Sequence, residues 1–282
     1  MNLFKSRIGL IAIALVSLVF LTGCFWWFNR WPESPTATEK TAARTEGNLA
    51  LGNPSNAGKD ENNYLLTRKQ YSLSYNNTKH IPNWVSWKLT AADIGSVPRR
   101  NNFDADNTLP NGWYQVKSTD YSGSGYDRGH MCPAADRSAT VEDNTATFIL
   151  TNIIPQARDN NQGPWAELEG YTRDQVKQGK EAYIISGGYG QKGVLSKGKV
   201  AIPANTWKVI VLTEKNAGGA AGVNDRTRVI AIDMPNEEGI KTTKWQQYLT
   251  TVRELESKTG YDFLSQVPKA VQNTVETVRD RS

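Results

Sequence analysis

The amino-acid sequence predicts an α+β protein with a central, largely antiparallel sheet flanked by helices. Apolar residues make up 38% of the chain and charged residues 22%, a balance typical of globular proteins, and 282 residues suffice for a sizeable core. Strand-like runs follow one another with only a few helical patterns between them, which favours an antiparallel arrangement. The predicted strands cover residues 64–66, 71–75, 84–89, 146–154, 182–188, 198–203, 206–212 and 227–232.

The helical patterns lie in the second half of the chain. A helix is predicted from residue 159 to residue 178, with polar cap residues at its start and Gly179 as its stop. Pro164 falls in the first turn, where backbone N–H groups lack helical partners, so it does not break the helix. A second helix is predicted over residues 245–258, where apolar residues recur at helical spacing, and a short third one near Pro268.

Residues 1–23 have the layout of an export signal, a short cationic head with Lys5 and Arg7 followed by an apolar stretch. The stretch ends in Leu21-Thr22-Gly23-Cys24, which resembles the lipobox of bacterial lipoproteins. This resemblance implies cleavage before Cys24 and a lipid anchor on that residue. Because residues 8–28 carry no charge, an uncleaved membrane-spanning segment is an alternative, as is a plain secretory signal. All three alternatives export the rest of the chain, to a bacterial membrane or envelope or to the medium.

The remaining chain is predicted to hold one folded domain. Residues 24–61 are rich in proline, threonine, asparagine and glycine and are predicted to form a disordered tether. The domain is expected to cover residues 62–265, and residues 266–282 to form a short C-terminal helix and tail.

Net charge and cysteine content limit which partners and which kinds of cysteine site the domain can have. The formal net charge of +5 is mildly basic and suits an anionic partner without demanding one. Cys24 and Cys132 are the two cysteines, and processing at Cys24 would leave one thiol in the domain. A cysteine-based zinc site and a structural disulfide are then excluded. We interpret Cys132 as a small buried hydrophobic residue.

The candidate catalytic segment is Asp127-Arg128-Gly129-His130. His130 is one of only two histidines, and the other, His80, lies in a polar turn and is interpreted as a solvated loop residue. An imidazole titrates near neutrality and can take a proton from water. Gly129 is expected to adopt a positive φ that aims the next side chain into a cleft.

Two sequence blocks resemble the DNA/RNA non-specific endonucleases, which are ββα-metal (His-Me finger) enzymes. The first block is Asp127–His130 followed by Pro133. The second block lies downstream at the family's spacing, and the similarity covers about residues 51–264. This second block comprises Thr151-Asn152-Ile153-Ile154-Pro155-Gln156, Asn161, Trp165, Leu168-Glu169 and Arg173.

The resemblance implies a ββα-metal finger site with a role for each matched residue. His130 would be the general base that activates the attacking water. Asn161 would be the one direct protein ligand of a Mg²⁺ or Mn²⁺ ion, while Glu169 and Asp127 would hold metal-bound waters.

Three arginines complete the implied site. Arg173 would neutralise charge on the phosphate. Arg99 matches a phosphate-contacting arginine of the family, although Arg100 beside it leaves that register open. Arg128 would lie near the phosphate or brace its own loop.

The implied activity is metal-dependent hydrolysis of DNA and RNA to 5′-phosphorylated products, with no preference for sugar or sequence. Some family members are guarded by a protein inhibitor, which would be a further partner. Two alternatives stay open: a non-enzymatic envelope lipoprotein that binds nucleic acid or glycan, and a phosphodiesterase acting on another phosphate substrate. The oligomeric state is not indicated.

Overall fold

The computed structural model describes residues 47–195 and 198–281. The predicted export signal, Cys24 and the first part of the predicted tether lie outside these residues. Of the helices in the described ranges, none combines the length and the apolar character that crossing a membrane requires.

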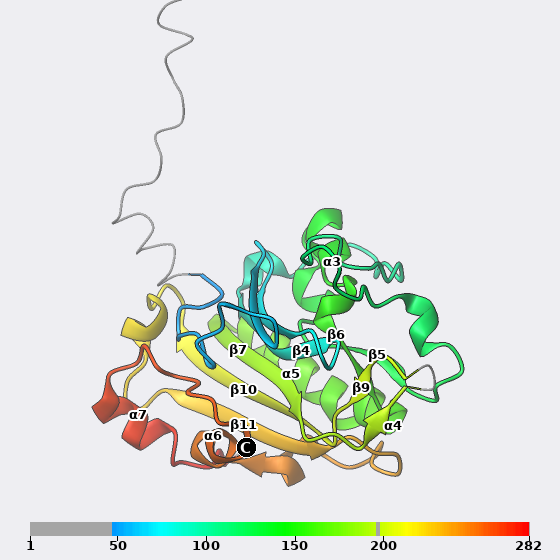
Figure 1. Cartoon of the computed structure of the whole chain (residues 1–282). Coiled ribbons are helices and arrows are strands. Elements are labelled where there is room, and N and C mark those ends of the chain that lie inside the picture. The colour runs from blue at the N-terminus through cyan, green and yellow to red at the C-terminus, as the bar shows by residue number, and fades with distance from the viewer. Residues whose placement is uncertain (1–46, 196–197, 282) are drawn as a thin grey trace, which may run out of the picture. The chain divides into compact units, whose positions relative to one another are not determined.

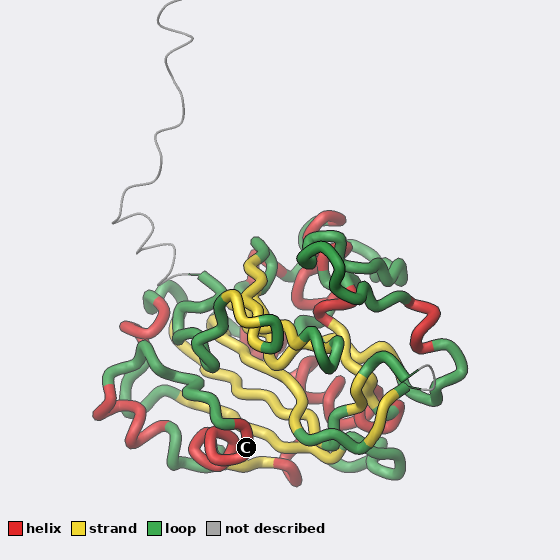
Figure 2. Tube along the Cα trace, in the orientation of Figure 1, coloured by secondary structure: helices red, strands yellow, loops and turns green. Residues whose placement is uncertain are grey.

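An eight-stranded sheet in which every pair of neighbours is antiparallel forms the centre of the fold (Figure 1). This confirms the predicted α+β class. Figure 2 shows the long central strands side by side, with helices and loops around them. In spatial order the strands are β1 (Lys59–Asp60), β2 (Asn63–Thr67), β3 (Ser72–Asn76), β4 (Ile81–Leu89), β7 (Lys180–Tyr189), β10 (Asn205–Glu214), β11 (Arg228–Pro235) and β12 (Leu249–Thr250).

The other elements are two short strand pairs and a set of mostly short helices. The strand pairs are β5 (Asp127–His130) with β6 (Ile153–Gln156), and β8 (Gly193–Val194) with β9 (Ala201–Ile202). The α-helices are α3 (Val141–Ala146), α4 (Arg158–Asn160), α5 (Ala166–Lys177), α6 (Val252–Thr259) and α7 (Lys269–Val275). A π-helical turn, Asn161–Trp165, joins α4 to α5, and 3₁₀ turns occur at Ala91–Asp93, Ser118–Tyr121, Ala134–Arg137, Leu150–Asn152, Gly219–Gly222 and Trp245–Tyr248.

The central sheet separates two hydrophobic cores. Successive side chains of a strand point to opposite faces, so on β10 Ile210 and Leu212 join one cluster while Val209 and Val211 join the other. The first cluster takes in residues of the β5–β6 pair and of α5, and the second takes in residues of α6 and α7. The face of the sheet that contacts the first cluster therefore carries the candidate catalytic segment.

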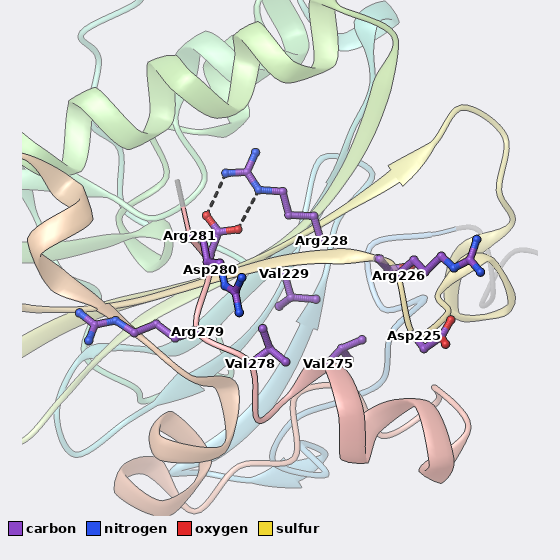
Figure 3. Close-up of a pocket in the computed structure, with 10 residues that line it drawn as sticks. Asp225, Arg226, Arg228, Val229, Val275, Val278, Arg279, Asp280 and Arg281 are labelled. Atoms are coloured by element: carbon purple, nitrogen blue, oxygen red, sulfur yellow. Dashed lines mark hydrogen bonds and ion pairs between the residues drawn. The ribbon is translucent and has the colours of Figure 1, made fainter.

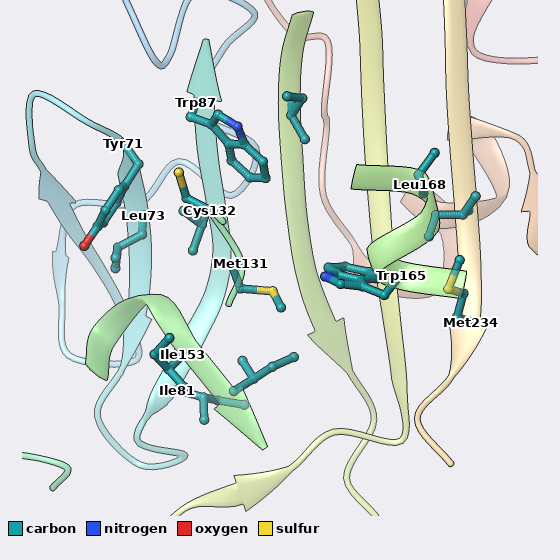
Figure 4. Packing of buried hydrophobic residues seen from close by; sticks show 14 of the residues in the cluster. Tyr71, Leu73, Ile81, Trp87, Met131, Cys132, Ile153, Trp165, Leu168 and Met234 are labelled. Atoms are coloured by element: carbon teal, nitrogen blue, oxygen red, sulfur yellow. The ribbon is translucent and has the colours of Figure 1, made fainter. Parts of the chain in front are cut away.

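Figure 4 shows how this segment is anchored to the first core. Met131 and Cys132, directly after β5, are fully buried and lie among side chains of the sheet. Ile153 of β6 and Trp165, at the start of α5, belong to the same cluster. The interpretation of Cys132 as a buried hydrophobic residue is confirmed, and burial raises the pKa of its thiol.

Four element predictions differ from the structure. The strand expected over residues 198–203 is reduced to β9, and the helix expected over residues 159–178 is interrupted at Gly163, whose backbone is not helical, directly before Pro164. The other two fail because local side-chain bonds stop a regular element. The strand expected over residues 146–154 is largely a turn, in which Asn152 donates to the carbonyl groups of Thr147 and Cys132, and β6 begins only at residue 153. The helix expected over residues 245–258 is split by β12. Thr251 and Glu254 form a capping box that starts α6 afresh.

The folded unit extends beyond both predicted boundaries. Residues 47–61 were expected in the tether, yet Ala50 and Leu51 are buried in the second core and Trp84 Nε1 donates to Ser55 Oγ over 2.8 Å. At the other end, α7 packs through Val275 against the same core. These apolar contacts were not visible from composition alone.

Candidate active site

The candidate site is a β-strand pair followed by a helix. β5 and β6 are antiparallel, with Asp127 opposite Gln156 and His130 opposite Ile153. From β6 the chain runs through α4 and the π-helical turn into α5. A cavity of about 550 Å³ opens here, and it brings together all the predicted site residues except Arg173. Its lining consists of Arg99, Asn101, Phe103, Asp127, Arg128, His130, Pro133, Asn161, Gln162, Ala166 and Glu169.

His130 sits at the inner wall of this cavity with only 6% of its surface exposed. Its ring contacts Phe103 and Phe148, at centroid distances of 5.4 and 4.8 Å. Burial, reinforced by the charges of Arg99 and Arg128, lowers the pKa of His130 to about 3. Its Nε2 atom is buried and has no hydrogen-bond partner in the described part of the chain. The imidazole is therefore neutral near pH 7 and has a nitrogen free to accept a proton.

Gly129 is required for a different reason than the sequence suggested. The expected positive φ is wrong, because Gly129 lies in β5 and is not among the left-handed glycines of the described residues. A Cβ at this position would lie 2.6 Å from the Cβ of Gln156 and closer still to its side-chain oxygen. Gln156 fills the space beside the strand, so only glycine fits.

A shared carboxylate oxygen fixes the amide of Asn161. Asp127 Oδ2 accepts from Asn161 Nδ2 at 2.9 Å and from Gln162 Nε2 at 2.8 Å. The guanidinium of Arg158 lies 3.8 Å from the other oxygen of Asp127. With Nδ2 engaged, Oδ1 is the atom of the Asn161 amide that can act as a ligand. Gln162 and Arg158 were not predicted as site residues.

Glu169 is held by a buried lysine that the sequence analysis missed. Lys208 of β10 is 2% exposed, and its ammonium group lies 3.4 Å from Glu169 Oε1 and 4.0 Å from the centre of the Trp165 ring. Burial raises the pKa of Glu169, and the charge of Lys208 opposes that rise. A single charge inside the apolar run 206–212 was the signal that could have identified Lys208.

Two arginines face the cavity. Arg99 lines it and lies over the Phe148 ring, with its guanidinium carbon 5.0 Å from the ring centre. Arg100 is not among the lining residues, so Arg99 is the arginine of this pair at the site. Arg128 lies over the Phe103 ring at 4.4 Å and donates to Ser118 Oγ. Both arginines thus place positive charge beside His130.

Arg173 points elsewhere. Its guanidinium pairs with Asp136 Oδ1 at 2.9 Å, and the other oxygen of Asp136 accepts from Trp87 Nε1 at 2.9 Å. These contacts tie α5 to the segment after His130 and to the sheet. The predicted contact of Arg173 with a phosphate stays a prediction.

The donor atoms at the cavity fit a hard divalent cation. Asn161, Asp127 and Glu169, which carry amide and carboxylate oxygens, all line this space. Mg²⁺ prefers oxygen ligands and keeps several of its waters, so one amide oxygen with two nearby carboxylates is an adequate protein contribution.

Comparison with known proteins shows to which family the chain belongs. The chain matches the sequence model of the DNA/RNA non-specific endonuclease family over residues 50–270. A nuclease of Nostoc sp. is 48% identical over 235 residues, covering 82% of this chain and 85% of the relative. The mitochondrial nuclease EXOG of Xenopus laevis is 29% identical over 256 residues, covering 86% and 67%.

A solved structure shares the fold as well. In the crystal structure of the EndoG/EndoGI complex, the matching chain superimposes with a TM-score of 0.68 and 25% sequence identity. The match covers 83% of this chain and 95% of that chain. The family match spans both the β5–β6 pair and α5, which carry the candidate site. The chain is a nuclease and belongs to the DNA/RNA non-specific endonuclease family.

Proposed function

We propose that this endonuclease cleaves DNA and RNA with one bound Mg²⁺ or Mn²⁺ ion, uses His130 as its general base and leaves 5′-phosphorylated products. The observation that supports this most is that His130 lines the same cavity as Asn161, while its buried Nε2 has no hydrogen-bond partner among the described residues. A base and a ligand for a cation are thus in one place.

Asn161 would hold the ion through its Oδ1, and Asp127 and Glu169 would hold the ion's waters. When bound, the ion would stabilise the negative charge that develops on the phosphate and on the leaving oxygen. The hydrogen bond from Asn161 to Asp127 keeps the amide oriented without any cation. The site is therefore organised before the substrate arrives.

His130 Nε2 would accept a proton from the water that attacks phosphorus. The bond from phosphorus to the 3′ oxygen would break, and this oxygen would take a proton from a water molecule to become the 3′ hydroxyl. This bond scission leaves the phosphate on the 5′ side of the downstream fragment. The rings of Phe103 and Phe148 restrict the imidazole to one orientation and keep bulk water away from it. A fixed, desolvated base needs little rearrangement during the reaction.

Arg99 and Arg128 would contact the phosphate on the side facing His130. Contacts of this kind position the nucleic acid backbone and carry no sequence information. The absence of a preference for sugar or base in the proposed activity follows from such contacts.

The experiment uses plasmid DNA and single-stranded RNA as substrates. The wild-type protein should degrade both with Mg²⁺ and stop on addition of EDTA, and H130A should lose about 10²–10⁴-fold in rate. H80A is the matched control, because His80 lies outside the cavity and bonds the carbonyl group of Lys199. Plasmid left intact by the wild-type protein with Mg²⁺ or Mn²⁺ would return the non-enzymatic binding protein to consideration.

The role of Asn161 is tested separately. N161A should require a higher Mg²⁺ concentration for half-maximal activity, because the direct ligand is lost. If its Mg²⁺ dependence matches that of the wild type, Asn161 is not the metal ligand.

Export and anchoring are also part of the proposal. The sequence of residues 1–24 supports lipidation at Cys24 and attachment to a bacterial membrane. Palmitate labelling of the wild type should be lost in C24S, and labelling that persists would rule out lipidation at this residue. The EndoG/EndoGI complex supports a protein inhibitor as a further partner.

A further inference from the structure

A second cavity lies apart from the active site. It has a volume of about 340 Å³ and shares no lining residue with the active-site cavity. The start of β11 and the segment that follows α7 form its walls (Figure 3). Its lining residues are Asp225, Arg226, Thr227, Arg228, Val229, Val275, Val278, Arg279, Asp280 and Arg281.

The charge of this cavity is positive. Its lining contains four arginines and two aspartates, which gives an excess of two positive charges. Arg228 is already engaged, since it bonds both oxygens of Asp280, at 2.8 and 2.9 Å, and the hydroxyl of Tyr171. Arg226, Arg279 and Arg281 are exposed, and within residues 47–195 and 198–281 none of them forms an ion pair.

Three valines contribute apolar surface to the lining of this cavity. Val229 and Val275 are buried, whereas Val278 is 55% exposed. Figure 3 shows the three valines between the arginines, with Arg226 on one side and Arg279 on the other. A small anion would engage one side only. A chain of phosphates joined by less polar sugars would engage both arginines and cover the valines.

We propose that this cavity is an accessory binding site for the sugar-phosphate backbone of the nucleic acid substrate, remote from the bond that is cleaved. The proposal rests on the nuclease function and adds a second contact region to it. Arg228 connects the cavity to the catalytic helix, because Tyr171 lies on α5 between Glu169 and Arg173. A long substrate bound here would stay close to the active site, which raises its effective concentration there.

The test compares R226A/R279A with K59A/K79A in the full-length protein. Each variant loses two exposed positive charges, but Lys59 and Lys79 lie at the β1–β4 side of the sheet, away from this cavity. The Michaelis constant for long single-stranded DNA is measured at several salt concentrations. Turnover of a dinucleotide, which cannot reach both sites, is measured in parallel.

We plot the logarithm of the Michaelis constant for long DNA against the logarithm of the salt concentration. The slope for R226A/R279A should be smaller than that of the wild type by about 0.7 for each phosphate that the variant no longer binds. Turnover of the dinucleotide should stay at the wild-type value, and K59A/K79A should behave as the wild type. V278D is a second variant, at an exposed position, and its added negative charge should raise the same Michaelis constant.

Three results would overturn the proposal. The first is an unchanged slope in R226A/R279A, and the second is an equal change in K59A/K79A. The third is loss of binding to anionic lipid vesicles in R226A/R279A with an unchanged slope on DNA, which would assign the cavity to a membrane surface. If the wild-type protein cleaves neither substrate, the nuclease function itself fails, and that outcome is separate from these three.

Discussion

At the scale of single residues, the surroundings of His130 decide at which pH this proposed base can work. Its pKa of about 3 lies far below the ordinary value of 6.5 for histidine, because the ring is buried and two arginines face it. Between pH 6.5 and 3 the unfolded chain binds a proton at His130 and the folded chain does not. His130 thus reduces the free energy of unfolding as the pH falls through this range, and has no such effect above it.

The same shift predicts the pH profile of catalysis. His130 stays neutral down to low pH, so kcat/KM should show no loss with an apparent pKa near 6.5 on its acidic side. The measurement is kcat/KM for plasmid DNA from pH 4 to 8 at saturating Mg²⁺. An acidic limb centred near 6.5 would show that the imidazole is more solvated than its contacts with Phe103 and Phe148 indicate.

A second prediction at this scale concerns Gly129. G129A should lower the free energy of unfolding by about 1–3 kcal/mol, because the new methyl group overlaps Gln156. G170A is the control: Gly170 lies in α5, and a Cβ there would meet nothing within 4 Å. That change should stabilise the protein by up to about 1 kcal/mol through helix propensity. Chemical denaturation of both variants measures the difference, and equal stabilities would contradict it.

From the sequence, it was predictable which of the candidate residues lie in one cavity wherever their chemistry and spacing coincide. The cavity brings together Asp127, His130, Asn161 and Glu169, all recognised from the two sequence blocks. Lys208 was not recognised, because it comes from β10 and reaches Glu169 only through the tertiary fold. A contact between residues that are far apart in the sequence, such as Lys208 and Glu169, cannot be predicted from the spacing of a motif.

At the scale of elements, the joint between α5 and β10 depends on the pair of Glu169 and Lys208. K208M would leave the largely buried carboxylate of Glu169 without its nearest cation, and should destabilise the protein by up to about 3–5 kcal/mol, the cost for a fully buried charge. K208M/E169Q should recover part of this loss, because no charge is left uncompensated. Urea unfolding midpoints measure both variants. Equal midpoints for K208M and the double variant would show that the pair does not support this joint.

Elements with a strong apolar pattern were predictable, and those shaped by local bonds were not. The runs 182–188, 206–212 and 227–232 coincide with β7, β10 and β11, three long strands of the sheet, to within three residues at each end. The apolar run 146–154 instead became a turn, since the side chain of Asn152 competes for the backbone groups that a strand would use. The spacing of apolar residues indicates which residues are buried. It does not indicate where a polar side chain binds the backbone groups of a strand.

At the scale of the whole molecule, the N-terminal boundary of the folded unit can be tested by truncation. A chain starting at residue 47 should unfold at the same temperature as the full chain. A chain starting at residue 62 loses the cover over Trp84 that includes Leu51 and Ser55. Its melting temperature should fall by roughly 2–4 °C for each kcal/mol lost. Equal melting temperatures for the two truncated chains would restore residue 62 as the boundary.

The two ends of the eight-stranded sheet have a consequence for self-association. The outermost strands, β1 and β12, are only two residues long, and β1 consists of the charged pair Lys59 and Asp60. A long, uncharged outer strand offers a row of free backbone groups to which another chain can add, and natural sheets avoid this by shortening or charging it. The outer strands themselves thus offer little backbone through which copies of this protein could join their sheets at high local concentration.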